Sequence, residues 1–443
     1  MQQKREQWSS KIGFIMAAAG SAIGLGNLWK FPYIVGTNGG AVFLIIYIIF
    51  LILLGIPILL AEMAIGRSAG KNAVDSCKTI NPKFGFVGGI GILGAFLVLS
   101  GYGVVGGWVI KYIFKSFSYD NFTSDFFNEY ISKPFEPVIW TFIFMALNVL
   151  IVTGGVSKGI ERVSTVLLPL LLIFLFGLMI YSVTLPGAVD GIKYFLVPDF
   201  SGINSFSDIS KIAINAMGQV FFSLSLGMGT LITYGSYLPK KSDLVSNTIM
   251  VVTLDTAIAI ISGFTIIPAV FSFGLEVTGG PGLIFQTLPA VFMNIKGGSF
   301  ISAIFFTLVL FAAITSAISL LEVIVSWFSD KTGLSRTISS VIAGGAAFLI
   351  GIAASLSFGT LSGIKILGMN IFDFLNHAAD KVVMPIGGFL MCILVGYIWG
   401  IKPASDEISN GGSLRFRLKP LFAAAMKFIA PVLIIIIFIS SLF

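Results

Sequence analysis

Charged residues, cysteine and histidine are all scarce in this chain of 443 residues. Only 11% of the residues are charged and 56% are hydrophobic, a balance that excludes an ordinary soluble globular fold. The two cysteines, Cys77 and Cys392, fall in an inner loop and in a late apolar segment, so no disulfide between them is expected. His377 is the one histidine, which leaves no ligand cluster for zinc or haem chemistry.

Long apolar stretches, by contrast, recur along the whole chain. Stretches of about 20 residues are long enough to cross a hydrocarbon core of roughly 30 Å. We therefore expect an all-α integral membrane protein with 11 transmembrane helices in a single domain, 1–443. The predicted spans are 12–36, 41–65, 84–114, 136–153, 161–184, 211–237, 244–272, 299–328, 337–356, 371–400 and 419–443. The first of them is too long for a secretory signal peptide.

Basic and acidic residues are distributed unevenly between alternate loops. Lys and Arg gather in the loops on the side of the N-terminus, for example at Arg67, Lys71 and Lys240. The positive-inside rule then places the N-terminus in the cytoplasm, and the odd number of spans places the C-terminus outside. We expect a multi-pass protein of the cell (inner) membrane, whose net charge of +7 reflects orientation and not binding to nucleic acid.

Two predicted spans carry clusters of glycine and small residues near their middle. Span one holds GSAIGLGN at 20–27, and span six holds SLSLGMGT at 223–230. Glycine disfavours a helix interior by about 1 kcal/mol relative to alanine, so both runs predict an interrupted helix. The two interruptions lie five spans apart, in corresponding positions of two halves of the chain.

An interrupted helix is energetically unfavourable in lipid, which indicates that the interruption has a function. Freed backbone costs several kcal/mol per unsatisfied group, so it persists only where it is buried in protein or lines a cavity. Paired interruptions are typical of carriers built from inverted repeats, in which half-helix N-termini attract a carboxylate and freed carbonyls bind sodium. An amino acid carried with sodium fits both. The alternative is that the glycines only permit close helix packing.

Several motifs resemble the neurotransmitter:sodium symporter family, in particular its bacterial amino-acid carriers with the LeuT-type fold. The resemblance covers nearly the whole chain and rests on Arg5 with Trp8, 20–32, 62–67, 218–237 and 312–316. It implies a 5+5 inverted repeat with unwound helices 1 and 6, in which repeat one is about 10–184, repeat two about 209–400, and 419–443 an extra helix. Many relatives have twelve helices, and the oligomeric state stays open.

The resemblance implies two sodium sites built from oxygen ligands, with one or two ions per cycle and no organic cofactor. The first site falls on Ala22, Asn27, Ser223 and Asp255. The second falls on Gly20, Ile23, Ala312, Thr315 and Ser316. The hydroxyls of Thr315 and Ser316 could instead bond back to carbonyls four residues earlier in their own helix.

The resemblance also implies a substrate pocket. The polar end of an amino acid would lie on Ala22, Leu25, Gly26, Tyr102 and Ser223, with the Tyr102 hydroxyl donating to the carboxylate. The substrate side chain would meet Val98, Phe222, Ser225, Met228, Ser316 and Leu320, with Phe222 closing over it from outside. Ordinary helix packing is the competing explanation for the apolar members. Met228 and Ser225 leave room and one hydroxyl, which favours a hydrophobic or aromatic L-amino acid.

Asp255 lies among apolar residues of the seventh span, where an aspartate costs roughly 2.5–3.5 kcal/mol to insert. Many members of the family have a neutral asparagine at this position, and animal members bind chloride nearby. A carboxylate here supplies the negative charge from the protein itself. We therefore expect transport that does not need chloride, with Tyr47, Gln219 and Ser223 flanking Asp255.

Charged pairs correspond to the family's two gates. Lys30 would pair with Asp373 in the outer gate, and Arg5 with Asp330 in the inner gate. Most relatives have arginine in place of Lys30, and lysine cannot form a bidentate clamp. Snorkelling to the membrane interface is the alternative for Lys30, and an ordinary cytoplasmic positive charge is the alternative for Arg5.

Other residues match supporting elements of the family. Trp8 and Tyr237 match a cytoplasmic latch, and Glu62 resembles a glutamate that holds the unwound first helix by hydrogen bonds. Gly159 and Pro169 match a Gly-X9-Pro pattern, which predicts local unwinding or a simple kink at the start of span five.

The sequence thus predicts a sodium-coupled secondary symporter with alternating access, and not an enzyme. A membrane-embedded transferase would need an acidic cluster for a metal-bound diphosphate, and no DDxxD-like run occurs. A channel would need a repeated pore segment or rings of like charge, which are not visible. The expected partners are the amino acid and the lipid bilayer. Asp380 and Lys381 in span ten have no role in these motifs.

Overall fold

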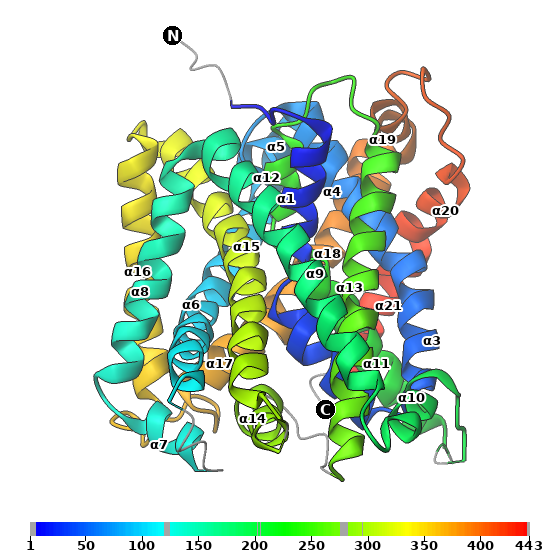
Figure 1. Ribbon diagram of the computed structural model, residues 1–443. Helices are drawn as coiled ribbons and strands as arrows, with labels where there is room; N and C mark the ends of the chain where they lie inside the picture. The colour runs from blue at the N-terminus through cyan, green and yellow to red at the C-terminus, as the bar shows by residue number, and fades with distance from the viewer. Residues whose placement is uncertain are drawn as a thin grey trace.

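The computed structural model describes residues 6–118, 125–201, 203, 205–274, 282–294 and 296–440, which form a bundle of helices (Figure 1). In this part of the chain, nine continuous segments are long and apolar enough to cross a membrane, and one bent pair makes a tenth. The remaining predicted span, 211–237, is divided between α11 (Phe206–Ser223) and α12 (Thr230–Gly235). All eleven predicted spans therefore correspond to helices.

The observed helices follow the predicted order, with shifts of a few residues at most ends. The crossing segments are α1 (Lys11–Ala22) with η1 (Gly26–Lys30) and α2 (Phe31–Thr37), α3 (Ala41–Phe50) with η2 (Leu51–Gly55) and α4 (Ile56–Ala69), η3 (Pro82–Phe84) with α6 (Gly85–Ser116), α8 (Glu136–Thr153), η5 (Val156–Glu161) with α9 (Arg162–Val183), α11 with α12, α13 (Leu244–Ser272), α15 (Gly298–Thr332), α16 (Arg336–Leu356), α17 (Ile371–His377) with η7 (Ala378–Val383), α18 (Met384–Ile393), η8 (Leu394–Gly400) and α19 (Ile401–Ile408), and α20 (Lys419–Ala424) with η9 (Ala425–Ile429) and α21 (Ala430–Ser440). The connecting helices are α5 (Ala73–Ile80), α7 (Phe126–Ser132), α10 (Ala188–Leu196) and η6 (Leu283–Thr287) with α14 (Leu288–Met293).

The connecting helices lie at two opposite faces of the bundle. One face, which we name the N face, carries the start of α1 together with α5, α12 and α19 (Figure 1). The other, which we name the far face, carries α7, α10, α14 and α17. α20 lies near the N face and α21 continues from it toward the far face, so the described chain begins at the N face and its last crossing helix runs toward the far face.

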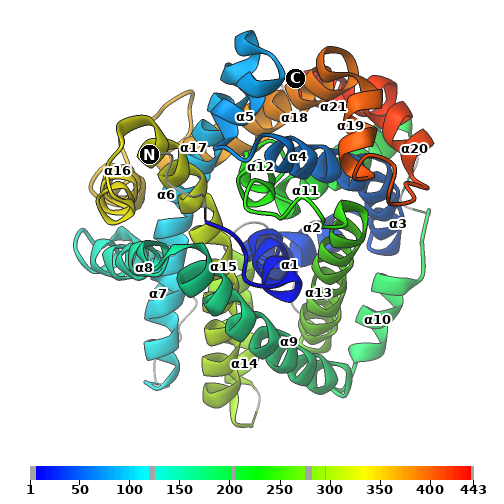
Figure 2. The ribbon, with the colours of Figure 1, turned by 90° about the horizontal axis from the view of Figure 1, so that it is seen from above.

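The interior of the bundle is built around α1 and α15. Seen from above, α1 lies near the middle and is surrounded by other helices (Figure 2), and it packs against α9, α13 and α15. α15 is 89% buried over its most apolar stretch, whereas the corresponding value is 28% for η5 with α9. Side chains at the rim, such as Leu150 at 70% and Ile173 at 65%, are apolar and exposed. A rim of this composition is suited to contact with lipid.

Two glycines let α4 and α12 approach backbone to backbone. A Cβ atom on Gly66 would overlap the carbonyl oxygen of Ile232, and one on Gly235 would lie 2.7 Å from the carbonyl oxygen of Met63. Small residues permit this close approach, which gains van der Waals contact that lipid cannot replace. α12, the second half of an interrupted helix, is therefore fixed against a continuous one.

We predict that Gly66→Ala destabilises the protein by about 1–3 kcal/mol or more, because rigid backbone must move to admit the methyl group. The matched control is Gly89→Ala in α6, where an added Cβ would meet nothing within 4 Å. It should leave stability unchanged or raise it by up to about 1 kcal/mol, because alanine favours a helix interior over glycine. Thermal unfolding in detergent micelles compares the two, and equal melting temperatures would contradict the close contact.

Candidate functional site

The first interruption separates α1 from η1. The α-helix ends at Ala22, Ile23 is extended with φ −77° and ψ 98°, and the two helical parts differ in direction by 51°. Side chains recover the freed backbone groups. Leu25 N donates to the Tyr102 hydroxyl at 2.9 Å, and Gly26 O accepts from Gln219 Nε2 at 3.0 Å. The break is thus stabilised by α6 and α11.

The second interruption separates α11 from α12. Ser225, Gly227 and Gly229 have φ of 51°, 77° and 71°, in the left-handed region that glycine tolerates best. Gly227 N donates to Glu62 Oε1 at 2.8 Å. Glu62 was expected to hold the unwound first helix, and this is corrected by the structure, which places it at the second break. The reason is that Glu62 lies on α4, the helix that packs against α12.

The carboxylate of Asp255 joins both breaks. Asp255 is fully buried on α13, and its Oδ1 accepts from Asn27 Nδ2 at 2.8 Å. Ser223 Oγ donates to Oδ1 at 2.9 Å and to Oδ2 at 3.0 Å. Three of the four residues predicted for the first sodium site are thus in direct contact, and the fourth, Ala22, is the last residue of α1. Carboxylate, hydroxyl and amide oxygens are a suitable donor set for sodium.

The residues predicted for the second sodium site lie where α1 faces α15. A Cβ on Gly20 would lie 3.0 Å from Cβ of Thr315, so the α1 backbone touches this side chain. Thr315 Oγ1 donates to Phe311 O at 3.0 Å and to Ala312 O at 3.1 Å, which is the back-bonded arrangement considered as the alternative. A hydroxyl that donates in this way keeps its acceptor lone pairs, so the same oxygen remains able to face a cation. Ile23 and Ser316 are buried at the same junction.

Nine of the eleven predicted substrate residues line one small cavity between the two breaks. They are Ala22, Gly26, Val98, Tyr102, Phe222, Ser225, Met228, Ser316 and Leu320. The free volume is about 10 Å³, so these side chains lie close together. The other two lie beside this cavity: Leu25 lines a second cavity toward the far face, and Ser223 is bonded to Asp255. No carboxylate, ammonium or guanidinium group is among the nine.

A charged pair covers this cavity on the side of the far face. Lys30 Nζ lies 2.7 Å from Asp380 Oδ2 and 3.9 Å from the centre of the Phe222 ring. The predicted partner Asp373 is not paired with Lys30. Its carboxylate accepts from Asn370 Nδ2 at 2.7 Å, and its backbone N donates to Asn370 Oδ1 at 2.8 Å, at the start of α17. Asp380 is seven residues further along, which is two helical turns deeper and on the same side. The outer pairing is therefore corrected from Asp373 to Asp380.

A second closure lies toward the N face. Trp8 Nε1 donates to Tyr234 O at 3.0 Å, and the indole ring packs edge-on against Tyr234 and Tyr237. Arg5 lies outside the described residues, and its expected partner Asp330 accepts from Asn72 Nδ2 at 2.9 Å. The N-terminal segment is also tied to span five, because Ser9 N donates to Glu161 Oε2 at 2.8 Å.

Glu322 and Arg336 form part of this closure and were not found from the sequence. Glu322 is fully buried, accepts from the Tyr237 hydroxyl at 2.6 Å and pairs with Arg336 Nη2 at 2.5 Å. The signal that could have found it was the one used for Asp255, an acidic residue inside an apolar span. Glu322 and Arg336 thus supply a buried charged pair next to the aromatic latch.

Span five begins with a π-helical turn, where local unwinding or a kink was predicted. Gly159 lies inside η5, a π-helical turn, and Pro169 lies inside α9. The turn is wound more widely than an α-helix but is not unwound. Its last residue, Glu161, also accepts from Ser10 Oγ at 3.0 Å.

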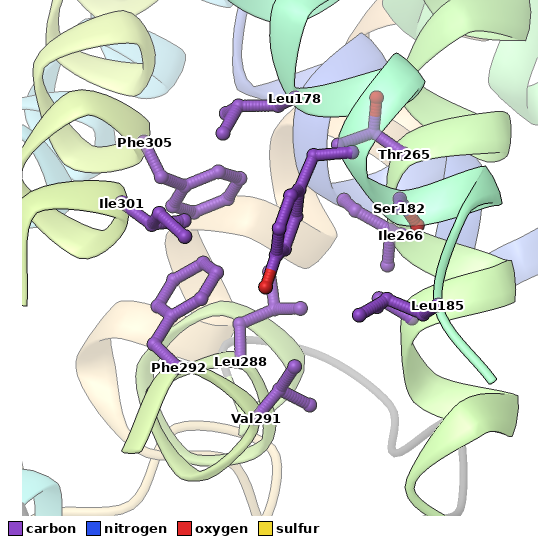
Figure 3. A pocket seen from close by; sticks show the side chains of 12 residues that line it. Leu178, Ser182, Leu185, Thr265, Ile266, Leu288, Val291, Phe292, Ile301 and Phe305 are labelled. Atoms are coloured by element: carbon purple, nitrogen blue, oxygen red, sulfur yellow. The ribbon is translucent and has the colours of Figure 1, made fainter. Parts of the chain in front are cut away.

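Two further cavities differ in character from the central one. A cavity of about 990 Å³ opens beside the N-face closure and is lined by Glu6, Lys71, Tyr237, Asp330 and Arg336 among others. A small cavity between α9, α13, α14 and α15 is lined almost wholly by apolar side chains (Figure 3). Unlike the central cavity, this small cavity is not lined by either helical break, so it offers no freed backbone groups to the charged ends of an amino acid.

We predict that Arg336→Gln loosens the N-face closure, because the buried Glu322 carboxylate loses its cation. Breaking a buried pair costs about 3–5 kcal/mol, and less where one partner is partly exposed, as Arg336 is at 21%. The measurement is the rate of thiol modification of Ser319→Cys, a buried position on α15, after Cys77 and Cys392 have been replaced by alanine. Faster labelling is expected.

The matched control is Lys331→Gln, which removes an exposed positive charge near the same end of α15. It should leave the labelling rate unchanged. Equal labelling in Arg336→Gln and the unmodified background would show that the Arg336–Glu322 pair does not hold this side closed.

Comparisons with known proteins agree with this geometry over the whole chain. The model of the sodium:neurotransmitter symporter family matches residues 5–131 and 129–443. The chain is 40% identical to an uncharacterized sodium-dependent transporter, YhdH, of Bacillus subtilis (strain 168), over 99% of this chain and 98% of that protein. It is 37% identical to an uncharacterized sodium-dependent transporter of Haemophilus influenzae, over 100% of this chain and 99% of that protein.

The fold is likewise similar to that of a solved transporter. The crystal structure of MhsT in complex with L-phenylalanine matches with a TM-score of 0.90 and 42% sequence identity, covering 99% of this chain and 100% of that one. The predicted all-helical fold with interrupted helices is thereby confirmed.

Proposed function

The chain belongs to the sodium:neurotransmitter symporter family of transporters, and on that basis we propose that it carries a hydrophobic or aromatic L-amino acid with sodium and without chloride. The observation that carries this proposal is the cavity between the two helical breaks. It joins the ends of interrupted helices to an apolar lining, which matches the two ends of such an amino acid. Sodium-dependent transport itself follows from the family.

The polar end of the substrate would lie against the breaks. The Tyr102 hydroxyl accepts from Leu25 N, so its own hydrogen remains available for a substrate carboxylate. The N-terminal ends of the half-helices that follow each break add partial positive charge. Asn27, Ser223 and Asp255 would hold a sodium ion beside this carboxylate, so that ion and substrate stabilise each other.

The other end of the cavity favours an uncharged side chain. Val98, Phe222, Met228 and Leu320 supply apolar surface, and Ser225 and Ser316 supply the hydroxyls. A charged substrate side chain would lose its hydration here with no opposite charge to receive it. L-phenylalanine, the ligand named for MhsT, meets these requirements.

Two closures on opposite sides of this cavity support alternating access. Lys30, Asp380 and Phe222 would open toward the far face, and Trp8, Tyr237 and the Glu322–Arg336 pair toward the N face. We propose that the N face is cytoplasmic, because Arg67, Lys71 and other basic residues lie near it. The far face and the C-terminus would then lie outside the inner membrane.

The substrate class is tested by competition against sodium-dependent uptake of radiolabelled L-phenylalanine into liposomes. Leucine, tyrosine and tryptophan should compete, and aspartate and lysine should not. Met228→Phe should weaken the affinity for aromatic substrates by about tenfold or more, because overpacking a filled site costs about 1–3 kcal/mol. Met250→Phe, at an exposed position of α13, is the control and should change nothing. Absence of sodium-dependent competition by all twenty amino acids would refute the proposal.

The role of Asp255 is tested by ion replacement. Uptake by the unmodified protein should be the same in sodium chloride and sodium sulfate, because the carboxylate supplies the negative charge. Asp255→Asn should lose most of its uptake in sodium sulfate. Its uptake should be about tenfold higher in sodium chloride than in sodium sulfate. Asp243→Asn, which removes a carboxylate from the start of the same helix, should leave the ion dependence unchanged. Full uptake by Asp255→Asn regardless of sodium and chloride would contradict this role.

A further inference from the structure

The Lys30–Asp380 pair lies between two cavities on the far-face side of the protein. One is the cavity of about 250 Å³ above Phe222 and Tyr102, on the substrate path. The other, which we name the side cavity, has about 230 Å³ and is lined by Lys30, Asp380, Lys381, Asn215, Phe221 and Ile434 among others. Lys30 and Asp380 line both, whereas Lys381 lines only the side cavity.

The side cavity has an excess of positive charge. Two ammonium groups, Lys30 and Lys381, face a single carboxylate, Asp380, which already lies 2.7 Å from Lys30. Among the residues that the structure describes, no carboxylate lies within ion-pair distance of Lys381. The formal charge of the three groups is therefore +1, which one monovalent anion would neutralise.

Lys381 lies within a membrane-crossing segment, where a charge without a partner is costly. It belongs to η7, inside the continuous segment Ile371–Ile408, and is partly buried. Ionisable residues in such segments pair with one another or mark a path or site for a ligand. Since the protein provides no ion-pair partner in its described part, a bound anion is the partner that fits.

The rest of the lining selects among anions. Ile34, Phe221, Pro385 and Ile434 give the side cavity apolar walls, and α21 supplies the last of them. The volume of about 230 Å³ corresponds to roughly seven or eight water-sized groups, at about 30 Å³ each. A halide would leave these walls uncovered, whereas a short carboxylic acid would cover them with its hydrocarbon part.

We propose that the side cavity binds a small monocarboxylate, with its carboxylate between Lys30 and Lys381 and its hydrocarbon part against Phe221, Pro385 and Ile434. This site is separate from Asp255, whose carboxylate is met by Asn27 and Ser223. Because Lys30 also covers Phe222, the bound anion holds Lys30 in place and slows exchange of the transported substrate through the far face.

The test is thermal unfolding of the full-length protein in lipid nanodiscs, at constant sodium, with sulfate, chloride, acetate or butyrate as the anion. Butyrate should give a saturable rise in Tm of about 1–2 °C at ten times its Kd, and acetate should need a higher concentration. Lys381→Gln should abolish the saturable part, and Ile434→Trp, which fills the cavity without changing charge, should do the same. Lys365→Gln, at an exposed position in the loop before α17, should retain it.

A second measurement links the site to transport. Butyrate should slow the dissociation of bound radiolabelled L-phenylalanine several-fold in the unmodified protein and in Lys365→Gln, but not in Lys381→Gln. The unfolding measurement does not need a transported substrate, so it stands if L-phenylalanine fails to bind.

Three results would overturn the proposal. Equal butyrate responses in the unmodified protein and Lys381→Gln would show a general salt effect. A chloride response that matches butyrate would indicate a halide site. A response to free amino acids that exceeds the response to butyrate, with the same dependence on Lys381, would indicate a second site for the transported substrate.

Discussion

Unsatisfied backbone polar groups are costly in lipid, and the architecture of this protein depends on how two interrupted helices avoid them. Each break frees amide and carbonyl groups that no water in the bilayer can receive. The protein supplies the partners from other helices: Tyr102 and Gln219 at the first break, and Glu62 at the second. The helices that carry these side chains are held in position around the breaks, and the central cavity is what remains between them.

Buried charge follows the same requirement. Asp255 is met by Asn27 and Ser223, and Glu322 by Tyr237 and Arg336. These groups join segments distant in sequence, because α13 meets both breaks at Asp255, and α15 meets the turn after α12 and the start of α16 at Glu322. A buried charge without partners is costly, but these charges are bonded to residues of other helices. Their contacts therefore specify how the helices associate.

The sequence predicted the spans and the breaks well because each depends on local composition. Apolar length gave the eleven spans, and glycine placement gave the two interruptions. Three of the four residues predicted for the first sodium site also lie in contact, since family motifs carry that information. The partner of Lys30 was wrong because sequence position does not fix the depth of a side chain along a neighbouring helix. Glu322 was overlooked, although it met the criterion that identified Asp255.

The two half-helices near the N face are fastened in different ways. α12 meets α4 through glycine backbones, with no side chain between them that could rotate aside. The start of α1 is held by an indole ring and by serine hydroxyls on Glu161, contacts that can be exchanged for water one at a time. The glycine contacts therefore fix α12 to α4, whereas the serine contacts allow the start of α1 to separate from its neighbours. The sequence itself specifies which half-helix stays in place and which can move.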